Sequence, residues 1–183
     1  MKNLEIYIHI PFCVRKCEYC DFLSFPADDD AKLRYVKGLM AEMIFYGPLM
    51  KNYQVSSVYI GGGTPSSIDE QWIAALMEGV FDCFNVLPDA EISIECNPGT
   101  LSREKLLAYR DAGINRLSIG LQSANNDELK LLGRIHTFEQ FVTNYEVARN
   151  VGFKNINVDL MYGLPGQSAS QYMATVNKII RLH

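Results

Sequence analysis

Three cysteines lie close together near the amino terminus, in the sequence CVRKCEYC. Cys13, Cys17 and Cys20 are separated by four and three positions. Three thiolates can bind three irons of a cubic iron–sulfur cluster and leave the fourth iron open to a non-protein ligand. A structural zinc ion is the alternative, but it requires four ligands. His9, the best local candidate for the fourth ligand, is expected on a strand and pointing elsewhere, so the spacing favours the cluster.

A glycine-rich segment, GGGTP at residues 61–65, follows a second apolar run. Consecutive glycines also occur in loops that need only positive φ angles. At the end of a strand and opposite a cluster, they would let a ligand approach the main chain and bond to its N–H and C=O groups. We therefore interpret this segment as a cofactor-binding loop.

Several further polar residues fall at or near the ends of apolar runs. Glu95 ends one run, Gln122 follows another and Asp159 lies within a third. Arg134 lies between Gln122 and Asp159, in a connecting segment. Each of these residues taken alone would be interpreted as an ordinary polar residue of the surface. The occurrence of three of them at successive strand ends instead favours a shared site.

Short runs rich in β-branched and aromatic residues predict five strands, at 4–10, 55–62, 90–96, 114–121 and 156–163. Helical patterns follow them: 33–44 after the aspartates at 28–30, 72–81 after a capping box of Ser67 and Glu70, then 102–112, 138–150 and 168–182. Alternating strands and helices imply an α/β fold with a parallel sheet and right-handed crossovers.

The position of the cysteines selects between two parallel architectures. An open Rossmann-type sheet has its glycine-rich turn after the first strand, whereas here the cysteines follow that strand. We predict a partial TIM-type (β/α) barrel, truncated after its fifth β/α unit, forming one domain over residues 1–183 of a longer chain. Active sites of such barrels lie at the carboxyl ends of the strands, where the cysteines, residues 61–65, Glu95, Gln122 and Asp159 would meet.

Composition restricts the class of protein. The chain has 183 residues, 48% apolar and 21% charged, with a net charge of −4. Its 17 lysines and arginines are scattered, which argues against nucleic acid as a partner. We expect no membrane span and no signal peptide, and hence a cytoplasmic location. The remaining cysteines, Cys83 and Cys96, are interpreted as small buried apolar side chains, and His9, His136 and His183 as structural or solvated residues.

The cysteine motif with its aromatic Tyr19 resembles that of radical S-adenosylmethionine (SAM) proteins. The segments YIHIPFC, YIGGGTPS, IECNPG, RLSIGLQS, LGR and NVDLMYGLPGQ are similar, in this order, to the oxygen-independent coproporphyrinogen III oxidase family and its heme-chaperone branch. The resemblance extends from about residue 5 to residue 175, which is nearly the whole chain.

This resemblance implies a [4Fe-4S] cluster on the three cysteines, SAM chelating the open iron, and an electron donor that reduces the cluster. It also implies a set of SAM-binding residues. Tyr7 would lie beside the cofactor, Gly62, Gly63 and Thr64 at its methionine end, Glu95 and Arg134 at its charged methionine groups, and Gln122 and Asp159 at its ribose hydroxyls.

One residue bears on the branch of the family. The oxidases have a further cysteine two residues after the third ligand, and here that position is Phe22. The chain also begins only six residues before Tyr7, without the extension of the oxidases. The resemblance therefore favours a chaperone that binds heme and transfers it to an acceptor protein. The alternative is an oxidase in porphyrin biosynthesis that decarboxylates coproporphyrinogen III.

Overall fold

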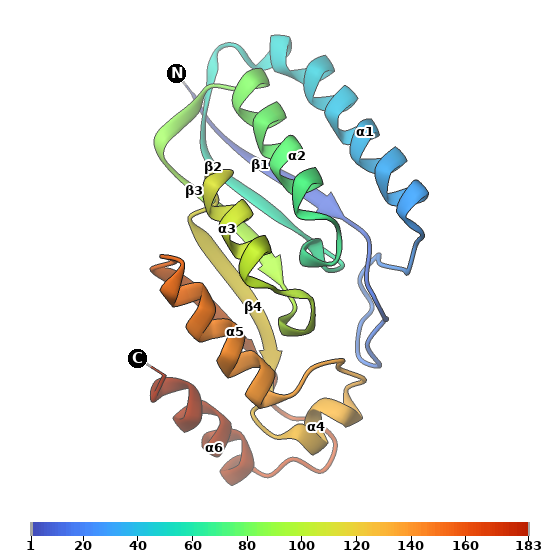
Figure 1. The fold of residues 1–183 in the computed structure, drawn as a ribbon, viewed down its shortest axis with the longest axis vertical. Helices are drawn as coiled ribbons and strands as arrows, with labels where there is room; N and C mark the ends of the chain where they lie inside the picture. Colours follow the sequence, from blue (N-terminus) through green and yellow to red (C-terminus); the bar gives the residue numbers. More distant parts are fainter. Residues whose placement is uncertain (1, 183) are drawn as a thin grey trace.

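The computed structural model describes residues 2–182 and contains one curved parallel sheet (Figure 1). Its strands are β1 (Lys2–Ile10), β2 (Tyr53–Gly62), β3 (Val86–Cys96), β4 (Arg116–Gln122) and β5 (Asn155–Leu160). They lie side by side in chain order, and every neighbouring pair is parallel. The predicted parallel α/β partial barrel is confirmed, although the fifth strand ends at Leu160 rather than at residue 163.

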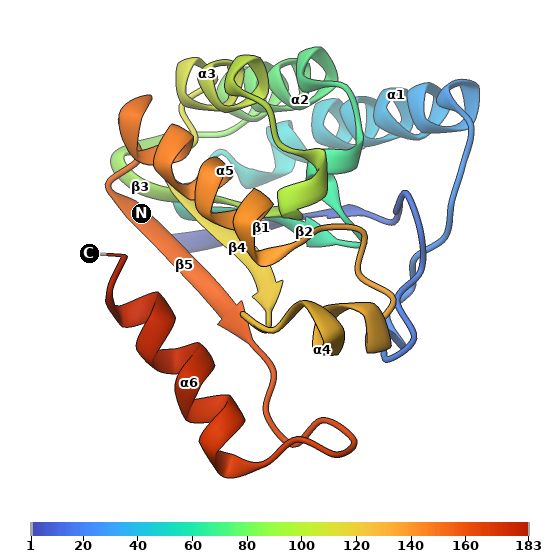
Figure 2. The ribbon, with the colours of Figure 1, turned by 60° about the horizontal axis from the view of Figure 1, so that its bottom comes forward.

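Five connecting helices cover the outer face of the sheet (Figure 2): α1 (Asp29–Tyr46), α2 (Glu70–Cys83), α3 (Arg103–Asp111), α5 (Phe138–Asn150) and α6 (Ala169–Ile180). The short helix α4 (Asn126–Leu131) lies instead near the ends of the strands. Three short 3-10 turns accompany them: η1 (Gly47–Met50), η2 (Pro65–Ser67) and η3 (Pro98–Thr100). Within residues 2–182, no helix is long and apolar enough to cross a membrane.

One predicted helix cap is confirmed by the structure, and another is wrong. Asp28 caps α1, since its carboxylate accepts from the Ala31 N–H at 2.7 Å, as the aspartate cluster predicts. The predicted capping box of Ser67 and Glu70 is wrong. Ser67 ends a 3-10 turn that starts at a proline, and Asp69 caps α2 instead. Helix α4 was not predicted, because six residues are too few for a helical period.

The two faces of the sheet differ in polarity because side chains alternate along each strand. Ile8, Ile60, Ile94 and Leu117 are nearly inaccessible and pack under the helices in the main hydrophobic core. The intervening positions point to the concave face and are mostly polar. The fold therefore places a hydrophobic core on one side of the sheet and a polar surface on the other.

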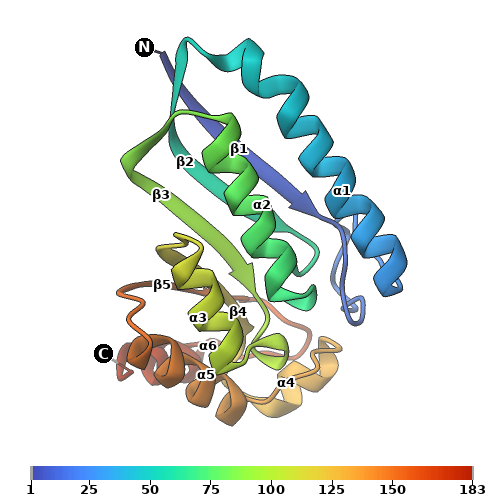
Figure 3. The same ribbon diagram turned by 45° about the horizontal axis from the view of Figure 1, so that its top comes forward.

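The segments that carry the predicted site gather at one end of the molecule. The cysteine loop and α4 lie beyond the carboxyl ends of the strands (Figure 3). The Glu18 N–H donates to the Leu132 carbonyl at 3.1 Å, which joins these two segments directly. The site is thus built where the barrel rule places it.

Candidate cofactor site

The cysteine loop is closed at its base by main-chain hydrogen bonds. Phe12 and Phe25 form a parallel bridge, with Phe25 N–H donating to the Pro11 carbonyl at 2.9 Å and Cys13 N–H to the Phe25 carbonyl at 3.1 Å. The buried Phe12 ring packs edge-on against the rings of Phe25 and Tyr35. The loop therefore begins and ends on the rigid sheet while its cysteines extend beyond it.

The three thiols of this loop are free and half-buried, and each has a polar neighbour. The Cys13 sulfur accepts from the Thr64 hydroxyl at 3.4 Å, the Cys17 sulfur from the Arg134 guanidinium at 3.6 Å, and the Cys20 sulfur lies 3.9 Å from the Ser24 hydroxyl. In the described chain, no three His, Cys, Asp or Glu side chains group as a single metal ion would require. Cysteines that bind separate irons of a cluster have no need to converge on one point.

The glycines after β2 allow two backbone segments to approach closely. A Cβ on Gly63 would lie 2.8 Å from the Phe12 carbonyl oxygen and 3.0 Å from the Cys13 sulfur. Gly62 has φ +118°, and a Cβ there would collide with the His9 ring at 2.6 Å. A side chain at Gly63 would push β2 away from the cysteine loop, and one at Gly62 would push it away from His9 of β1.

The main-chain N–H groups of residues 62–64 have protein acceptors, contrary to the prediction that they would bond to a ligand. Gly62 N–H donates to Glu95 at 3.0 Å, and the next two N–H groups donate to carbonyls of Ile10 and Phe12 at 2.8 and 2.7 Å. The loop therefore offers a ligand a surface without side chains rather than free N–H groups.

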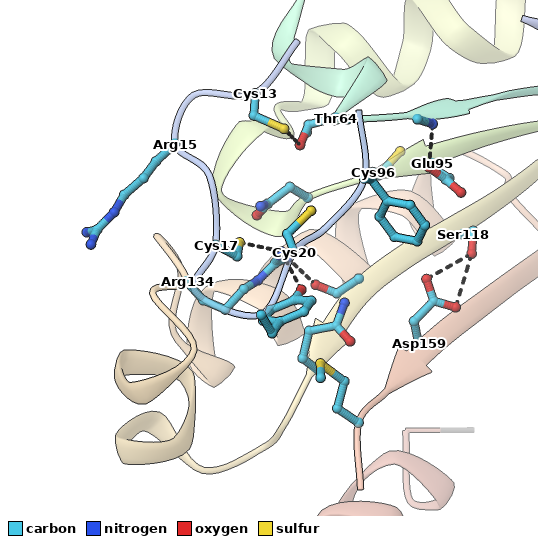
Figure 4. A pocket seen from close by; sticks show the side chains of 18 residues that line it. Cys13, Arg15, Cys17, Cys20, Thr64, Glu95, Cys96, Ser118, Arg134 and Asp159 are labelled. Carbon is cyan, nitrogen blue, oxygen red and sulfur yellow. Dashed lines mark hydrogen bonds between the residues drawn. The ribbon is translucent and has the colours of Figure 1, made fainter. Parts of the chain in front are cut away.

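A cavity of about 370 Å³ lies between the cysteine loop and the strand ends (Figure 4). Ten of the eleven predicted site residues line it: Cys13, Cys17, Cys20, Gly62, Gly63, Thr64, Glu95, Gln122, Arg134 and Asp159. In Figure 4 the cysteines occupy one side of the cavity, and Asp159 with Ser118 the opposite side. The predicted convergence of these residues is observed.

Tyr7 is the predicted site residue that does not line this cavity. Its ring is 58% exposed on the concave face and stacks on Tyr59 at a centroid distance of 6.2 Å. Its hydroxyl pairs with His9 Nδ1 at 2.9 Å. Tyr7 therefore lies outside the cavity, elsewhere on the concave face.

Glu95 connects β2 to β3 at the floor of the cavity. It accepts from the Tyr59 hydroxyl at 2.9 Å and from the Gly62 N–H at 3.0 Å. Burial and the hydrogen bond to Glu95 both raise the pKa of Tyr59, so this phenol remains a donor. The carboxylate thereby holds the glycine-rich turn in its left-handed conformation.

Arg134 brings positive charge to the thiols. Its Nη2 donates to the Gly120 carbonyl, and its Nη1 lies 3.6 Å from the Cys17 sulfur and 3.5 Å from the Tyr19 hydroxyl. Burial raises the pKa of Tyr19 to about 12. The Arg134 Nε is buried and has no acceptor among the described residues. Because Arg134 also lines the cavity, an anionic ligand there would meet the positive charge of its guanidinium.

The far wall is formed by β4 and β5. Asp159 accepts from the Ser118 hydroxyl at 3.2 Å and from the Asn157 amide at 2.6 Å. Gln122 has φ +73°, the one positive φ among described residues other than glycine. It lies where the β4–β5 register shifts. Such strained residues concentrate at functional sites, which supports its assignment to the cavity.

A buried polar network holds the segment after Gln122, and it was not predicted from the sequence. The Glu128 carboxylate, only 8% exposed, accepts from the Ser123 hydroxyl and from the Gln167 amide at 3.0 Å. Thr175 of α6 accepts from the Ala124 N–H at 3.2 Å. These contacts join β4, α4 and α6 around the residue that follows Gln122.

Lys105 supports the glycine-rich loop from behind, and it too was not singled out from the sequence. Its ammonium donates to the carbonyls of Ser66 and Ile68 at 2.7 and 2.8 Å. Burial lowers its pKa. Further lining residues that sequence reasoning missed are Arg15, Tyr19, Phe22, Asn97, Ser118 and Met161. The two-residue period of β4 could have identified Ser118, since it shares a face with Gln122.

The other histidines and cysteines are mostly structural. His9 bonds to Tyr7 and, at 3.2 Å, to the Leu23 carbonyl. His136 is buried, which lowers its pKa to about 4. His183 lies outside the described residues. Cys96 is buried at the cavity wall, while Cys83 is only partly buried against the core.

Comparison with known proteins places this architecture in a family. The sequence model of the radical SAM superfamily matches residues 7–179 of this chain. The chain belongs to the radical SAM superfamily. Membership implies a [4Fe-4S] cluster and SAM as cofactors, and the donor set fits both: three thiols on one loop, and a cavity with two guanidiniums and two carboxylates beside them.

Two curated relatives are described as heme chaperones. The heme chaperone HemW of Escherichia coli (strain K12) is 38% identical over 98% of this chain and 48% of its own length. HemW of Bacillus subtilis (strain 168) is 38% identical over 96% of this chain and 47% of its own length. A solved structure, coproporphyrinogen III oxidase (HemN) from Escherichia coli, superposes with a TM-score of 0.91 at 33% identity, covering 100% of this chain and 42% of that one. The chain spans about half the length of the curated relatives it matches.

Proposed function

We propose that this chain is the radical SAM part of a heme chaperone, which binds a [4Fe-4S] cluster and SAM and transfers heme to an acceptor protein. The observation that carries the proposal is its similarity to two proteins described as heme chaperones, at 38% identity over nearly the whole chain. Phe22 at the position of the additional oxidase cysteine supports the same branch.

The cysteine loop would hold the cluster through Cys13, Cys17 and Cys20. When bound and reduced by an electron donor, the cluster supplies one-electron reductive chemistry to SAM. The guanidinium of Arg134, which lines the cavity, is suited to a carboxylate, and the partly buried Glu95 to an ammonium group. Gln122 and Asp159 on the opposite wall can exchange hydrogen bonds with ribose hydroxyls.

An oxygen-independent coproporphyrinogen III oxidase is the second candidate. The superposition on such an oxidase, with a TM-score of 0.91 at 33% identity, favours it. Because fold and cofactor do not determine the reaction, the two candidates differ in what the protein does with a porphyrin. A chaperone binds heme and releases it unchanged, whereas an oxidase converts coproporphyrinogen III.

Anaerobic reconstitution of the full-length protein tests the cofactor part. We expect a brown protein with about four irons per chain and loss of the cluster on Cys17→Ala. Cys83→Ala is the matched control and keeps the iron content unchanged. A colourless protein that binds zinc instead would contradict the cluster assignment.

Incubation of the reconstituted protein with heme, SAM and reductant tests the function. We expect a heme absorption spectrum, passage of that heme to an apo-hemoprotein, and unchanged coproporphyrinogen III in a parallel assay. Steady formation of protoporphyrinogen IX would overturn the chaperone and establish the oxidase.

A further inference from the structure

Among the described residues, no strand pairs with the outer edge of β1. On its other side β1 pairs with β2 from Lys2 to Ile10. Within residues 2–182 the free edge is covered only near its carboxyl end, where Tyr35 donates to the His9 carbonyl at 2.9 Å and Phe25 bridges to Phe12. Figure 3 shows β1 as the outermost strand with α1 running beside it. Such an edge presents main-chain donors and acceptors to any strand that approaches.

A groove of about 270 Å³ follows this edge and shares no lining residue with the cofactor cavity. Five consecutive residues of β1, from Leu4 to Ile8, line it. Alternate side chains of a strand point to opposite faces, so a groove in contact with five consecutive residues lies along the edge of the strand rather than over one face. The opposite wall consists of Leu39, Glu42, Met43, Tyr46, Met50 and Phe84.

The apolar wall continues onto the surface of α1. Tyr46 lines the groove and is 44% exposed, and its ring lies 5.1 Å from that of Phe45, which is 67% exposed. Leu49, one turn further along the chain, is 61% exposed. Contiguous exposed apolar surface of this kind marks interaction sites.

The charges in the groove have one sign. Glu5 and Glu42 are the charged residues among those that line it, and no lysine, arginine or histidine joins them. A second copy of this chain would bring its own Glu5 and Glu42 to the same interface by symmetry, and like charges across paired strands destabilise the pairing. The groove therefore suits a different chain with a positive charge.

We propose that the groove binds an extended, basic segment of a partner protein, which pairs with β1 as an additional strand. Its main chain would satisfy the free N–H and C=O groups between Leu4 and Ile8. Its apolar side chains would contact Met43 and Tyr46, and a lysine or arginine would lie near Glu5 and Glu42. This mode of recognition combines main-chain pairing for affinity with side-chain contacts for specificity.

Hydrogen exchange of the full-length protein with a probe peptide tests the proposal. The probe is a seven-residue peptide of alternating valine and lysine with blocked ends. We expect slower exchange of the amides of residues 4–8 when it is added. The same peptide with alternate N-methylated residues cannot pair with a strand and should give no protection. Glu42→Lys should weaken binding by roughly tenfold, since it replaces attraction by repulsion. Glu146→Lys, on the exposed face of α5, is the matched control and should bind normally.

Three results would overturn the proposal: no protection of residues 4–8, equal binding of the N-methylated peptide, or equal binding by Glu42→Lys and wild type. Protection of the same amides by self-association, without any peptide, would assign the edge to a second copy instead and would also overturn it. The exchange measurement does not depend on cofactor binding. Its outcome can therefore be judged independently of the proposed function.

Discussion

Replacement of Glu128 by glutamine should lower the free energy of unfolding by about 1–3 kcal/mol. The Glu128 carboxylate accepts two hydrogen bonds, from Ser123 and Gln167. A hydrogen bond to a charged acceptor contributes roughly 1.5–3 kcal/mol and a neutral one roughly 0.5–1.5 kcal/mol. Glutamine retains one oxygen for these donors but loses the charge. Its amide nitrogen would lie where Oε1 now has no partner among the described residues.

Alanine at the same position should cost more, roughly 2–5 kcal/mol, because both donors lose their acceptor and a small cavity forms. Urea unfolding followed by circular dichroism measures both variants, and an unchanged denaturant slope would show that the midpoint shift reports stability. Glu146→Gln, an exposed glutamate on α5, is the control and should change stability by less than about 0.5 kcal/mol.

The result that refutes this reasoning is simple to recognise. If Glu128→Gln and Glu146→Gln unfold at the same urea concentration, the buried network does not hold the fold together. Because Ser123 directly follows Gln122, we also expect Glu128→Gln to weaken SAM binding. That loss should disappear in a Gln122→Ala background, where the residue it supports is already removed.

Other changes have equally definite outcomes. Lys105→Met leaves two carbonyls behind the glycine-rich loop without their donor. The free energy of unfolding in urea should fall by about 1–3 kcal/mol, and a variant as stable as the wild type would show that Lys105 does not stabilise this loop. Asp159→Ala should weaken SAM binding by roughly 1–3 kcal/mol in calorimetry while the iron content stays constant, and unaltered affinity would remove Asp159 from the site. Gly63→Ala should lower both SAM and iron occupancy, because the methyl group collides with the cysteine loop; full occupancy would show that the loop can move aside. The pKa of His136 is about 4 in the folded protein and about 6.5 in the unfolded chain. Between these pH values the unfolded chain binds a proton at His136 and the folded protein does not. The free energy of unfolding should therefore fall as the pH drops from 6.5 to 4. His136→Leu should flatten that dependence in unfolding measured at pH 7 and pH 5, and an unchanged slope would assign it to other groups.

The strands and the convergence of the site could be predicted from the sequence because both follow from local patterns. Alternating apolar residues in β1 and β3 identify strands, the alternation with helices predicts a parallel sheet, and the position of the cysteines after the first strand favours barrel order over a Rossmann-type order. Once the strands are parallel, their carboxyl ends must meet, which brings Glu95 and Asp159 to the cysteines without further information.

The supporting contacts could not be predicted, because they join residues far apart in the chain. Nothing near Lys105 indicates that its ammonium reaches the carbonyl of Ser66, and a buried Glu128 looks like any helical surface glutamate. Tyr7 shows the opposite limit: the family resemblance implies that it lies beside the cofactor, but in the structure its ring stacks on Tyr59 and does not line the cavity.

The closed base of the cysteine loop is important when the protein is exposed to oxygen. Oxygen destroys exposed iron–sulfur clusters. A domain whose fold depends on its cluster would unfold when the cluster is destroyed. Here main-chain hydrogen bonds at the Phe12–Phe25 bridge and the contact between the two rings hold both ends of the loop on the sheet. We therefore expect loss of a bound cluster to disorder a loop rather than the domain, so that the same polypeptide could accept a new cluster.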